Sequence, residues 1–228
     1  MEKEIINNRN DEIQMKFLLI GEQAVGKSSL INQYIEGKFE ENLLCAAGLD
    51  LKKKYIKINQ TSIKLMIYDT AGHERFRTLS KNQISSTKGI LIVYDVTEKE
   101  SFDALNFWMK SFKENANKNA ICLIIGNKID LENKRVIGYD EGKKFAEKYG
   151  VKFIETSAKS AVGVNEAFYS VAKEIFDNEI HVNDIIIEGN YKKKKNKDTE
   201  KKSCICWIIS ILNKVFFLII IIYFLYIV

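Results

Sequence analysis

The sequence predicts an α/β fold, a doubly wound and mostly parallel sheet of six strands with helices on both faces. Short apolar runs with the length of buried strands alternate with segments of helical periodicity. The first apolar run ends in a glycine-rich turn that leads into a helix, an arrangement typical of open parallel sheets. Two strand candidates joined by a short turn predict one antiparallel edge strand.

The predicted strands and helices follow one another in a regular order. Apolar runs predict buried strands at residues 15–21, 89–96 and 120–128, and KFIETSAK predicts a last strand at 152–159. Two further strands, 51–58 and 62–69, are joined by a predicted hairpin turn at Asn59–Gln60–Thr61. Helical patterns cover residues 27–36, 99–117, 140–148 and 164–178.

Composition limits the classes of protein that fit. At 228 residues the chain has room for one domain with appendages, and 46% hydrophobic residues argue against global disorder. The net charge of +5 is concentrated near the carboxyl end, where residues 192–202 hold seven lysines. A nearly neutral body argues against nucleic-acid binding there, and the basic segment predicts an anionic partner, most simply a membrane surface.

The cysteines and the amino terminus bear on the cellular compartment. Cys45 and Cys122 are isolated in the sequence, so we expect no disulfide framework and a reducing compartment. Residues 1–12 form a polar arm that lacks the apolar stretch of a secretory signal.

Residues 21–28, GEQAVGKS, match the phosphate-loop pattern G-x-x-x-x-G-K-[ST] between a strand and a helix. The pattern lets backbone N–H groups surround phosphates, Lys27 reach the β- and γ-phosphates, and the Ser28 hydroxyl ligate Mg²⁺. The alternative is a glycine-rich turn before a structural helix, and the loop alone does not choose between ATP and GTP. The candidate binding residues are Gly21, Gln23, Ala24, Val25, Gly26, Lys27, Ser28 and Ser29.

Three later motifs, each at the end of a predicted strand, select the nucleotide. In DTAG, Asp69 can hold Mg²⁺ through water, and Gly72 can contact the γ-phosphate. In NKID, the Asp130 carboxylate can accept hydrogen bonds from N1–H and the 2-amino group of guanine, a donor set that adenine lacks. In ETSAK, the Ala158 amide can donate to the guanine carbonyl. The other predicted guanine-site residues are Asn127, Lys128, Ser157 and Lys159.

With these motifs the chain resembles the Ras superfamily and, within it, the Rab family of small GTPases. The phrases GEQAVGKSSL, YDTAGHERFRTL, ILIVYDVTEKESF, GNKIDL and FIETSAK carry the resemblance over about residues 14–178. Within the family the chain looks nearest to the Rab-eighteen branch.

The resemblance implies a phosphate-loop NTPase G domain that binds GTP and GDP with Mg²⁺ and hydrolyses GTP. It also implies an exchange factor, a GTPase-activating protein and effectors of vesicle trafficking as partners. We expect a monomer. The resemblance further implies that Phe39 packs against the guanine edge, whereas an ordinary core aromatic is the alternative.

The chain departs from the family pattern where hydrolysis is concerned. Ala46 precedes Ala47 and Gly48 where the family has a threonine before its switch-one glycine, and residues 41–49 contain no hydroxyl. His73 replaces the glutamine that orients the attacking water; it is our catalytic candidate with Lys27, and a solvated loop residue is the alternative. Gln23 stands where a small residue is usual. We expect slow intrinsic hydrolysis, and the alternative function is a GTP-bound, essentially non-hydrolysing scaffold.

The face that recruits effectors in the family also differs in this chain. Leu51 replaces a phenylalanine, Tyr68 replaces a tryptophan, and Gln83–Ile84 stand where the family has a tyrosine pair. Because aromatic residues anchor interfaces, we expect unusual partners; compensated repacking of the core is the alternative.

We expect four segments, namely the arm 1–12, the GTP-binding domain 13–179, a basic linker 180–203 and a tail 204–228. Cys204 and Cys206 resemble the prenylated Cys-x-Cys ending of Rab proteins, but 22 residues follow Cys206. Residues 205–228 are apolar and long enough to cross a bilayer, although Asn213 and Lys214 interrupt them.

Three readings of the tail remain open. It is a membrane anchor with the cysteines palmitoylated or idle, an erroneous or alternatively spliced end of a product prenylated near Cys206, or a buried core helix. The first two predict the cytoplasmic face of an intracellular membrane, namely endoplasmic reticulum, Golgi or endosome.

Overall fold

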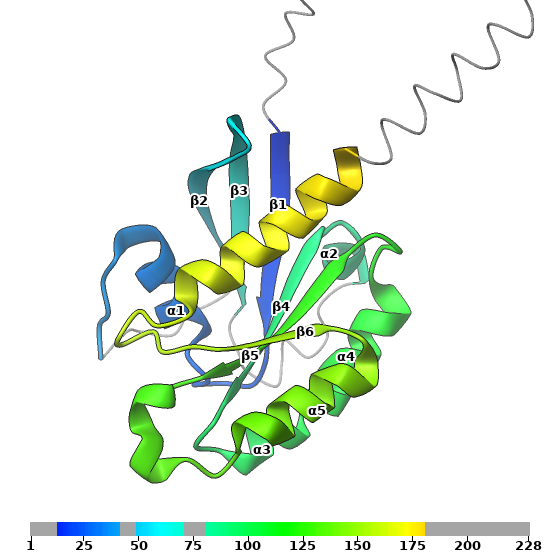
Figure 1. Ribbon diagram of the computed structural model, residues 1–228. Helices are drawn as coiled ribbons and strands as arrows, with labels where there is room; N and C mark the ends of the chain where they lie inside the picture. The colour runs from blue at the N-terminus through cyan, green and yellow to red at the C-terminus, as the bar shows by residue number, and fades with distance from the viewer. Residues whose placement is uncertain (1–12, 42–48, 71–80, 181–228) are drawn as a thin grey trace, which may run out of the picture. The chain divides into compact units, whose positions relative to one another are not determined.

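The computed structural model describes residues 13–41, 49–70 and 81–180. The chain divides into two compact units, Met1–Asp177 and Asn178–Val228, and nearly all described residues belong to the first. This unit contains a six-stranded sheet in the order β2-β3-β1-β4-β5-β6, with helices packed against it (Figure 1). The predicted fold class is confirmed.

The strands run parallel throughout the sheet except for β2, which pairs antiparallel with β3 at one edge. The prediction of a single antiparallel edge strand is therefore confirmed. The strands are β1 (Ile13–Ile20), β2 (Leu49–Ile58), β3 (Thr61–Thr70), β4 (Gly89–Asp95), β5 (Ile121–Asn127) and β6 (Lys152–Glu155).

The helices connect these strands on both faces of the sheet. They are α1 (Lys27–Glu36), α2 (Lys81–Ser85), α3 (Lys99–Asp103), α4 (Leu105–Asn115), the 3₁₀ helix η2 (Ile129–Lys134), α5 (Tyr139–Tyr149) and a helix over residues 164–180. The helical segments predicted over 99–117 are two helices, α3 and α4, which Ala104 separates. The short α2 and η2 were not predicted, since few residues give no clear apolar period.

Several predicted boundaries differ from those of the structure, among them the hairpin turn and the end of the last strand. The hairpin turn holds only Asn59 and Gln60, whose φ angles of 46° and 69° match the two-residue turns that suit twisted antiparallel strands, and Thr61 already belongs to β3. The last strand ends at Glu155 rather than at residue 159, because it pairs with β5 only over Lys152–Glu155. The residues after Glu155 turn into the pocket described below.

Two hydrophobic clusters form the core, one on each face of the sheet. Alternate residues of β1 serve opposite clusters: Phe17 and Leu19 pack with Tyr34 of α1 and Phe168 of the last helix, while Leu18 packs with α4. Because both faces are covered, β1 reads as a continuous apolar run. The faces of the sheet are therefore buried, and the carboxyl ends of its strands remain available for a site.

Candidate nucleotide-binding site

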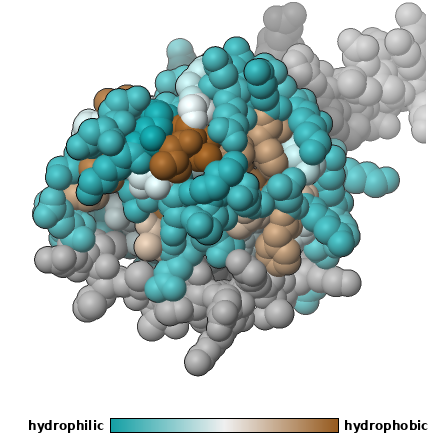
Figure 2. All heavy atoms as spheres, turned by 90° about the horizontal axis from the view of Figure 1, so that it is seen from below, coloured by the Kyte–Doolittle hydropathy of each residue, from teal (hydrophilic) through white to brown (hydrophobic). Residues whose placement is uncertain are grey.

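A pocket of about 400 Å³ opens at the carboxyl ends of the parallel strands. It brings together three motifs that are far apart in the sequence, through Lys27 and Ser28, Asn127 and Asp130, and Ala158 and Lys159. Figure 2 views the domain from below and shows a hydrophobic patch surrounded by hydrophilic side chains. The pocket itself is lined by Phe39, Leu131 and Ala158 as well as by charged and polar side chains, as expected for a ligand with a flat base and charged groups.

The backbone of the phosphate loop has positive φ angles and close contacts that favour glycine at two positions. Gly21 and Gly26 have φ angles of 141° and 95°, and a Cβ atom would collide with the Val93 carbonyl at the first and with the Asn127 side chain at the second. Val25 is buried in the core between them. Ala24 adopts a φ of 61°, a conformation that is costly for any residue with a Cβ. The loop is therefore tightly curved against β4 and β5.

Lys27 is 5% exposed, and its ammonium lies inside the loop. The Nζ atom donates to the carbonyl oxygens of Gly21 at 3.0 Å and Glu22 at 2.6 Å. The Glu22 carboxylate in turn accepts a hydrogen bond of 3.2 Å from the Trp108 indole of α4. The loop is thus anchored to α4 by a contact that the sequence analysis missed, because no motif spacing relates these two residues.

Ser28 and Asp69 meet although 41 positions separate them in the chain. The Ser28 hydroxyl donates to Asp69 Oδ2 at 2.5 Å, whereas Oδ1 is buried and has no hydrogen-bond partner within the described part of the chain. Burial raises the pKa of Asp69, although the Ser28 hydrogen bond and the Lys27 charge act in the opposite direction. Two oxygen donors with one unpaired oxygen are a donor set that suits Mg²⁺.

No group of three or more histidine, cysteine, aspartate or glutamate side chains that could hold a metal occurs among the described residues. Mg²⁺ does not require such a group, because it is commonly held by one or two protein oxygens together with phosphates and waters. Ser28 and Asp69 are therefore a sufficient protein contribution if a phosphate ligand supplies the rest.

Asn127 joins all three motifs at the other end of the pocket. Its Nδ2 atom donates to the Val25 carbonyl at 2.9 Å, and its Oδ1 atom accepts from the Thr156 hydroxyl at 3.1 Å and from the Ala158 amide at 3.3 Å. Asn127 is 1% exposed, so each of these bonds is shielded from water. The Ala158 amide, predicted to donate to a guanine carbonyl, donates to Asn127 in this structure.

Two further bonds orient the residues beside Asn127. Lys128, with a φ of 69°, places its Nζ atom 2.6 Å from Asp95 Oδ2. The Ser157 hydroxyl donates to Asp130 Oδ1 at 2.5 Å, which fixes a carboxylate that lines the pocket. The sequence motif contains both residues of the second pair but does not reveal that they bond.

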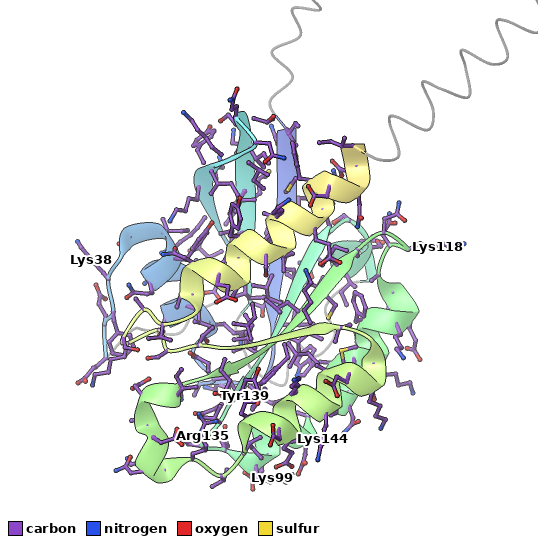
Figure 3. The ribbon with its side chains drawn as sticks, viewed as in Figure 1. Lys38, Lys99, Lys118, Arg135, Tyr139 and Lys144 are labelled. Atoms are coloured by element: carbon purple, nitrogen blue, oxygen red, sulfur yellow. The ribbon has the colours of Figure 1, made fainter. Side chains whose placement is uncertain are left out.

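Arg135 holds the start of the ETSAK segment in place through its bonds to Glu155. Its guanidinium donates to both Glu155 oxygens, at 2.6 Å and 3.1 Å, and so ties the segment after η2 to the end of β6 (Figure 3). These hydrogen bonds raise the pKa of Arg135. No pattern around Arg135 indicated this pair, since it depends on the adjacency of two distant segments.

Phe39 lies between the pocket and the core. It lines the pocket and also packs against the core cluster that contains Tyr34. The Lys159 ammonium is 5.9 Å from the centre of the Phe39 ring and 2.9 Å from Glu41 Oε1. One rim of the pocket is thus made of residues from the segment after α1 and from ETSAK.

Several predicted positions lie outside the described residues. They are Ala46, Gly72, His73, Cys204 and Cys206, together with residues 1–12 and the apolar tail. Within the described ranges, no helix combines the length and the apolar character needed to cross a membrane.

The positions expected on the effector face divide between exposed surface and core. Leu51 is 37% exposed, Tyr68 is half-buried against the core cluster of α4, and Ile84 is 1% exposed in the same cluster. The repacking alternative therefore fits Ile84, whereas Leu51 remains on the surface.

The fold and the pocket define a phosphate-loop α/β protein. A model of the Ras family matches residues 16–177. The GTP-binding protein ypt2 of Schizosaccharomyces pombe is 38% identical over 200 residues, which cover 87% of this chain and 100% of that protein. The Ras-related protein SEC4 of Saccharomyces cerevisiae is 40% identical over 187 residues, 82% of this chain and 86% of its own.

The human Ras-related protein Rab-8B is 41% identical over 160 residues, 70% of this chain and 77% of its own. The chain therefore belongs to the Ras family and is a Rab-type small GTPase, a family whose activity is GTP hydrolysis. The Rab-eighteen branch is not named among these relatives and stays a prediction.

Proposed function

We propose that this chain is a Mg²⁺-dependent GTP/GDP switch that regulates vesicle trafficking from the cytoplasmic face of an intracellular membrane. The observation that carries the proposal is one pocket in which Lys27 and Ser28 of the phosphate loop face Asn127 and Asp130 of NKID. A phosphate site and a guanine site in one cavity match a guanosine phosphate in both of its parts.

Each end of the pocket has its own chemical task. Lys27 and the N–H groups of the phosphate loop bind the phosphates, and Asp130, held by Ser157, accepts the N1–H and 2-amino hydrogens of guanine. Ser28 and Asp69 hold Mg²⁺, which when bound neutralises part of the phosphate charge. Adenine leaves the Asp130 carboxylate without donors, so the pocket rejects ATP.

Slow intrinsic hydrolysis is the finer part of this proposal. Gln23 of the phosphate loop lines the pocket, and we expect its side chain to take space near the last phosphate. Ala46 and His73 supply neither the hydroxyl nor the amide that the family uses at these positions. In the family an activating protein supplies an arginine in trans, and some also a glutamine, an effect worth on the order of 10³–10⁵ in rate.

Membrane attachment is proposed from the sequence after the described domain. Seven lysines in residues 192–202 precede Cys204 and Cys206 and an apolar stretch. A basic cluster beside an apolar or lipidated segment binds anionic membranes more firmly than either feature alone. The endoplasmic reticulum, the Golgi and endosomes all present such a surface to the cytoplasm.

The test is a single-turnover assay on the chain shortened to end at Ser203. Bound nucleotide is removed, GTP and Mg²⁺ are added, and conversion to GDP is followed by chromatography. We expect GDP to appear over minutes to hours. Intact GTP would favour the non-hydrolysing scaffold, and failure to retain either guanine nucleotide would refute the proposal.

A further inference from the structure

Glu22 of the phosphate loop is held at two points. Its backbone carbonyl accepts a hydrogen bond of 2.6 Å from Lys27 Nζ, and its carboxylate oxygen Oε1 accepts one of 3.2 Å from Trp108 Nε1. Trp108 belongs to α4 and follows Glu22 by 86 positions in the chain. One residue therefore links the ammonium at the phosphate end of the pocket to a helix that does not line the pocket.

Trp108 is fixed by the core around it. It is 5% exposed, and its neighbours Leu105 and Met109 on α4 are fully buried in the same core cluster. The indole N–H is the polar group of this side chain, and a buried N–H that finds no acceptor is costly. Because closely packed side chains keep one arrangement, Trp108 is the rigid partner of the bond, and Glu22 is the partner that it holds.

The two halves of the phosphate loop are anchored by different contacts. In the second half, Val25 is buried in the core, and its carbonyl accepts a hydrogen bond of 2.9 Å from Asn127 Nδ2. In the first half, Gly21 has a φ of 141°, and glycine leaves the backbone more freedom than any other residue. Glu22 follows Gly21 directly, so the Trp108 bond restrains the part of the loop that has the greater freedom.

This bond differs from one that only satisfies a polar group of the fold. The Tyr149 hydroxyl also makes a hydrogen bond of 3.2 Å to α4, at Asn106 Oδ1, and this bond joins two helices at the surface. The acceptor of the Trp108 bond, in contrast, belongs to a residue whose carbonyl contacts the Lys27 ammonium. The position of Trp108 is therefore transmitted to the charge proposed to bind the phosphates.

We propose that Trp108 is a positioning residue for the bound nucleotide. By holding the Glu22 side chain, it fixes the Glu22 carbonyl and, with it, the Lys27 ammonium and the first half of the phosphate loop. A site that is already arranged loses less conformational freedom on binding, so the bond slows release of the nucleotide. The inference rests on the guanine-nucleotide site proposed above and gives α4 a part in retaining the nucleotide.

The experiment uses the full-length chain in a mild non-ionic detergent, loaded with a fluorescent GDP analogue and Mg²⁺. Release into an excess of unlabelled GDP is followed by the change in fluorescence. Glu22→Ala removes the acceptor without altering the core, and Trp108→Phe removes the donor but keeps an aromatic ring. We expect release to become about tenfold faster in each variant, since a hydrogen bond to a charged group typically contributes at least that factor.

Two further variants separate positioning from packing. Glu22→Gln keeps an oxygen that accepts from the indole, so it is expected to restore most of the retention that Glu22→Ala loses. The double variant, Glu22→Ala with Trp108→Phe, is expected to release GDP no faster than either single variant, because one bond can be lost only once. A packing defect at Trp108 would instead add to the effect of Glu22→Ala.

Tyr149→Phe is the matched control, because it removes a bond of the same length to α4 that reaches no loop residue. It is expected to release GDP at the rate of the unaltered chain. Trp207→Phe leaves Trp108 as the single tryptophan of the chain. In this background Glu22→Ala is expected to shift the Trp108 emission, since the indole N–H loses its acceptor, whereas Tyr149→Phe leaves the emission unchanged.

Release rates for Glu22→Ala and Trp108→Phe equal to that of the control would overturn the proposal, as would additive effects in the double variant or an unshifted emission. If Trp108→Phe does not fold, the comparison of Glu22→Ala with Glu22→Gln decides. Nucleotide content, measured by chromatography on the same samples, tests the switch function separately. A chain that retains no guanine nucleotide would refute both the switch and the positioning, whereas retention that ignores Glu22 would refute the positioning alone.

Discussion

The two ends of the nucleotide pocket are built differently. The base end consists of Asn127, Lys128, Asp130, Ser157 and Ala158, and its polar side chains are bonded to one another or to neighbouring segments. At the phosphate end, formed by residues 21–28 and Asp69, the Asp69 Oδ1 atom is buried with no hydrogen-bond partner in the described residues. The polar groups of the base end are hydrogen-bonded within the protein, whereas the Asp69 Oδ1 atom of the phosphate end is not bonded by any described residue.

This difference in hydrogen bonding suits the two ends to different tasks, selection of the base and response to the bound phosphates. Hydrogen bonds made within the protein hold the base end in shape before any ligand arrives, so recognition costs little reorganisation. An unpaired buried oxygen is costly, and a bound cation or its water relieves that cost. Under the proposed function, the base end selects the nucleotide, and the phosphate end is the part whose energy depends on what is bound.

The largest effect is expected for Asn127→Ala, which removes the central hydrogen-bonding side chain of the base end. The change leaves the Val25 carbonyl, the Thr156 hydroxyl and the Ala158 amide without their buried partner, at a cost of about 1–3 kcal/mol for each group that stays unpaired. We expect GDP release to become roughly 10³-fold faster, measured with a fluorescent GDP analogue. Asn106→Ala, which removes only exposed bonds, is the control and should leave the rate unchanged.

Asp130→Asn tests whether the base end alone selects guanine. The amide still accepts N1–H, but its NH₂ group faces the 2-amino group of guanine, whereas xanthine presents a carbonyl there. We expect GTP affinity to fall about 100-fold and xanthosine triphosphate to become the preferred ligand. Competition between the two nucleotides measures this, with the exposed Asp140→Asn as control. Unchanged preference would remove Asp130 from base recognition.

Asp69→Asn tests the phosphate end. The amide oxygen still accepts the Ser28 hydrogen bond, but the charge is lost, so Mg²⁺ affinity should fall about ten- to a hundredfold. Chelation of Mg²⁺ by EDTA should then accelerate GDP release from the unaltered chain but barely affect the variant. Equal acceleration in both proteins would show that Asp69 does not support the metal.

The smallest effect is expected for Ala24→Gly. Glycine relieves the left-handed conformation, at a φ of 61°, but it also loses more entropy on folding, so we expect a net stabilisation of about 0.5 kcal/mol. Urea unfolding measures it. Ala161→Gly is the matched control, since Ala161 has a φ of 64° outside the phosphate loop. Both changes should stabilise the protein, and a destabilised Ala24→Gly would show that the loop needs the Cβ atom.

Prediction from sequence succeeded where the signal is local. Every strand of the sheet was predicted, and α1 has the predicted bounds of residues 27–36 because the phosphate loop and Gly37 mark its two ends. The predicted last strand was too long, because the residues after Glu155 have no pairing partner in β5. The helical segments predicted over 99–117 were found, but the position of the break at Ala104 was not predicted.

The sequence by itself determined the fold class, the order of the motifs and the guanine-nucleotide chemistry, because each depends on residue types at fixed short spacings. Only the tertiary structure decided which groups are paired. The Asn127 network, the Trp108 bond to Glu22 and the orphaned oxygen of Asp69 all join segments that are distant in the chain. The tertiary structure also decided that Lys52 and Lys54 of β2 contact α1 whereas Lys53 and Lys57 face outward. This depends on which side of the pleat α1 covers.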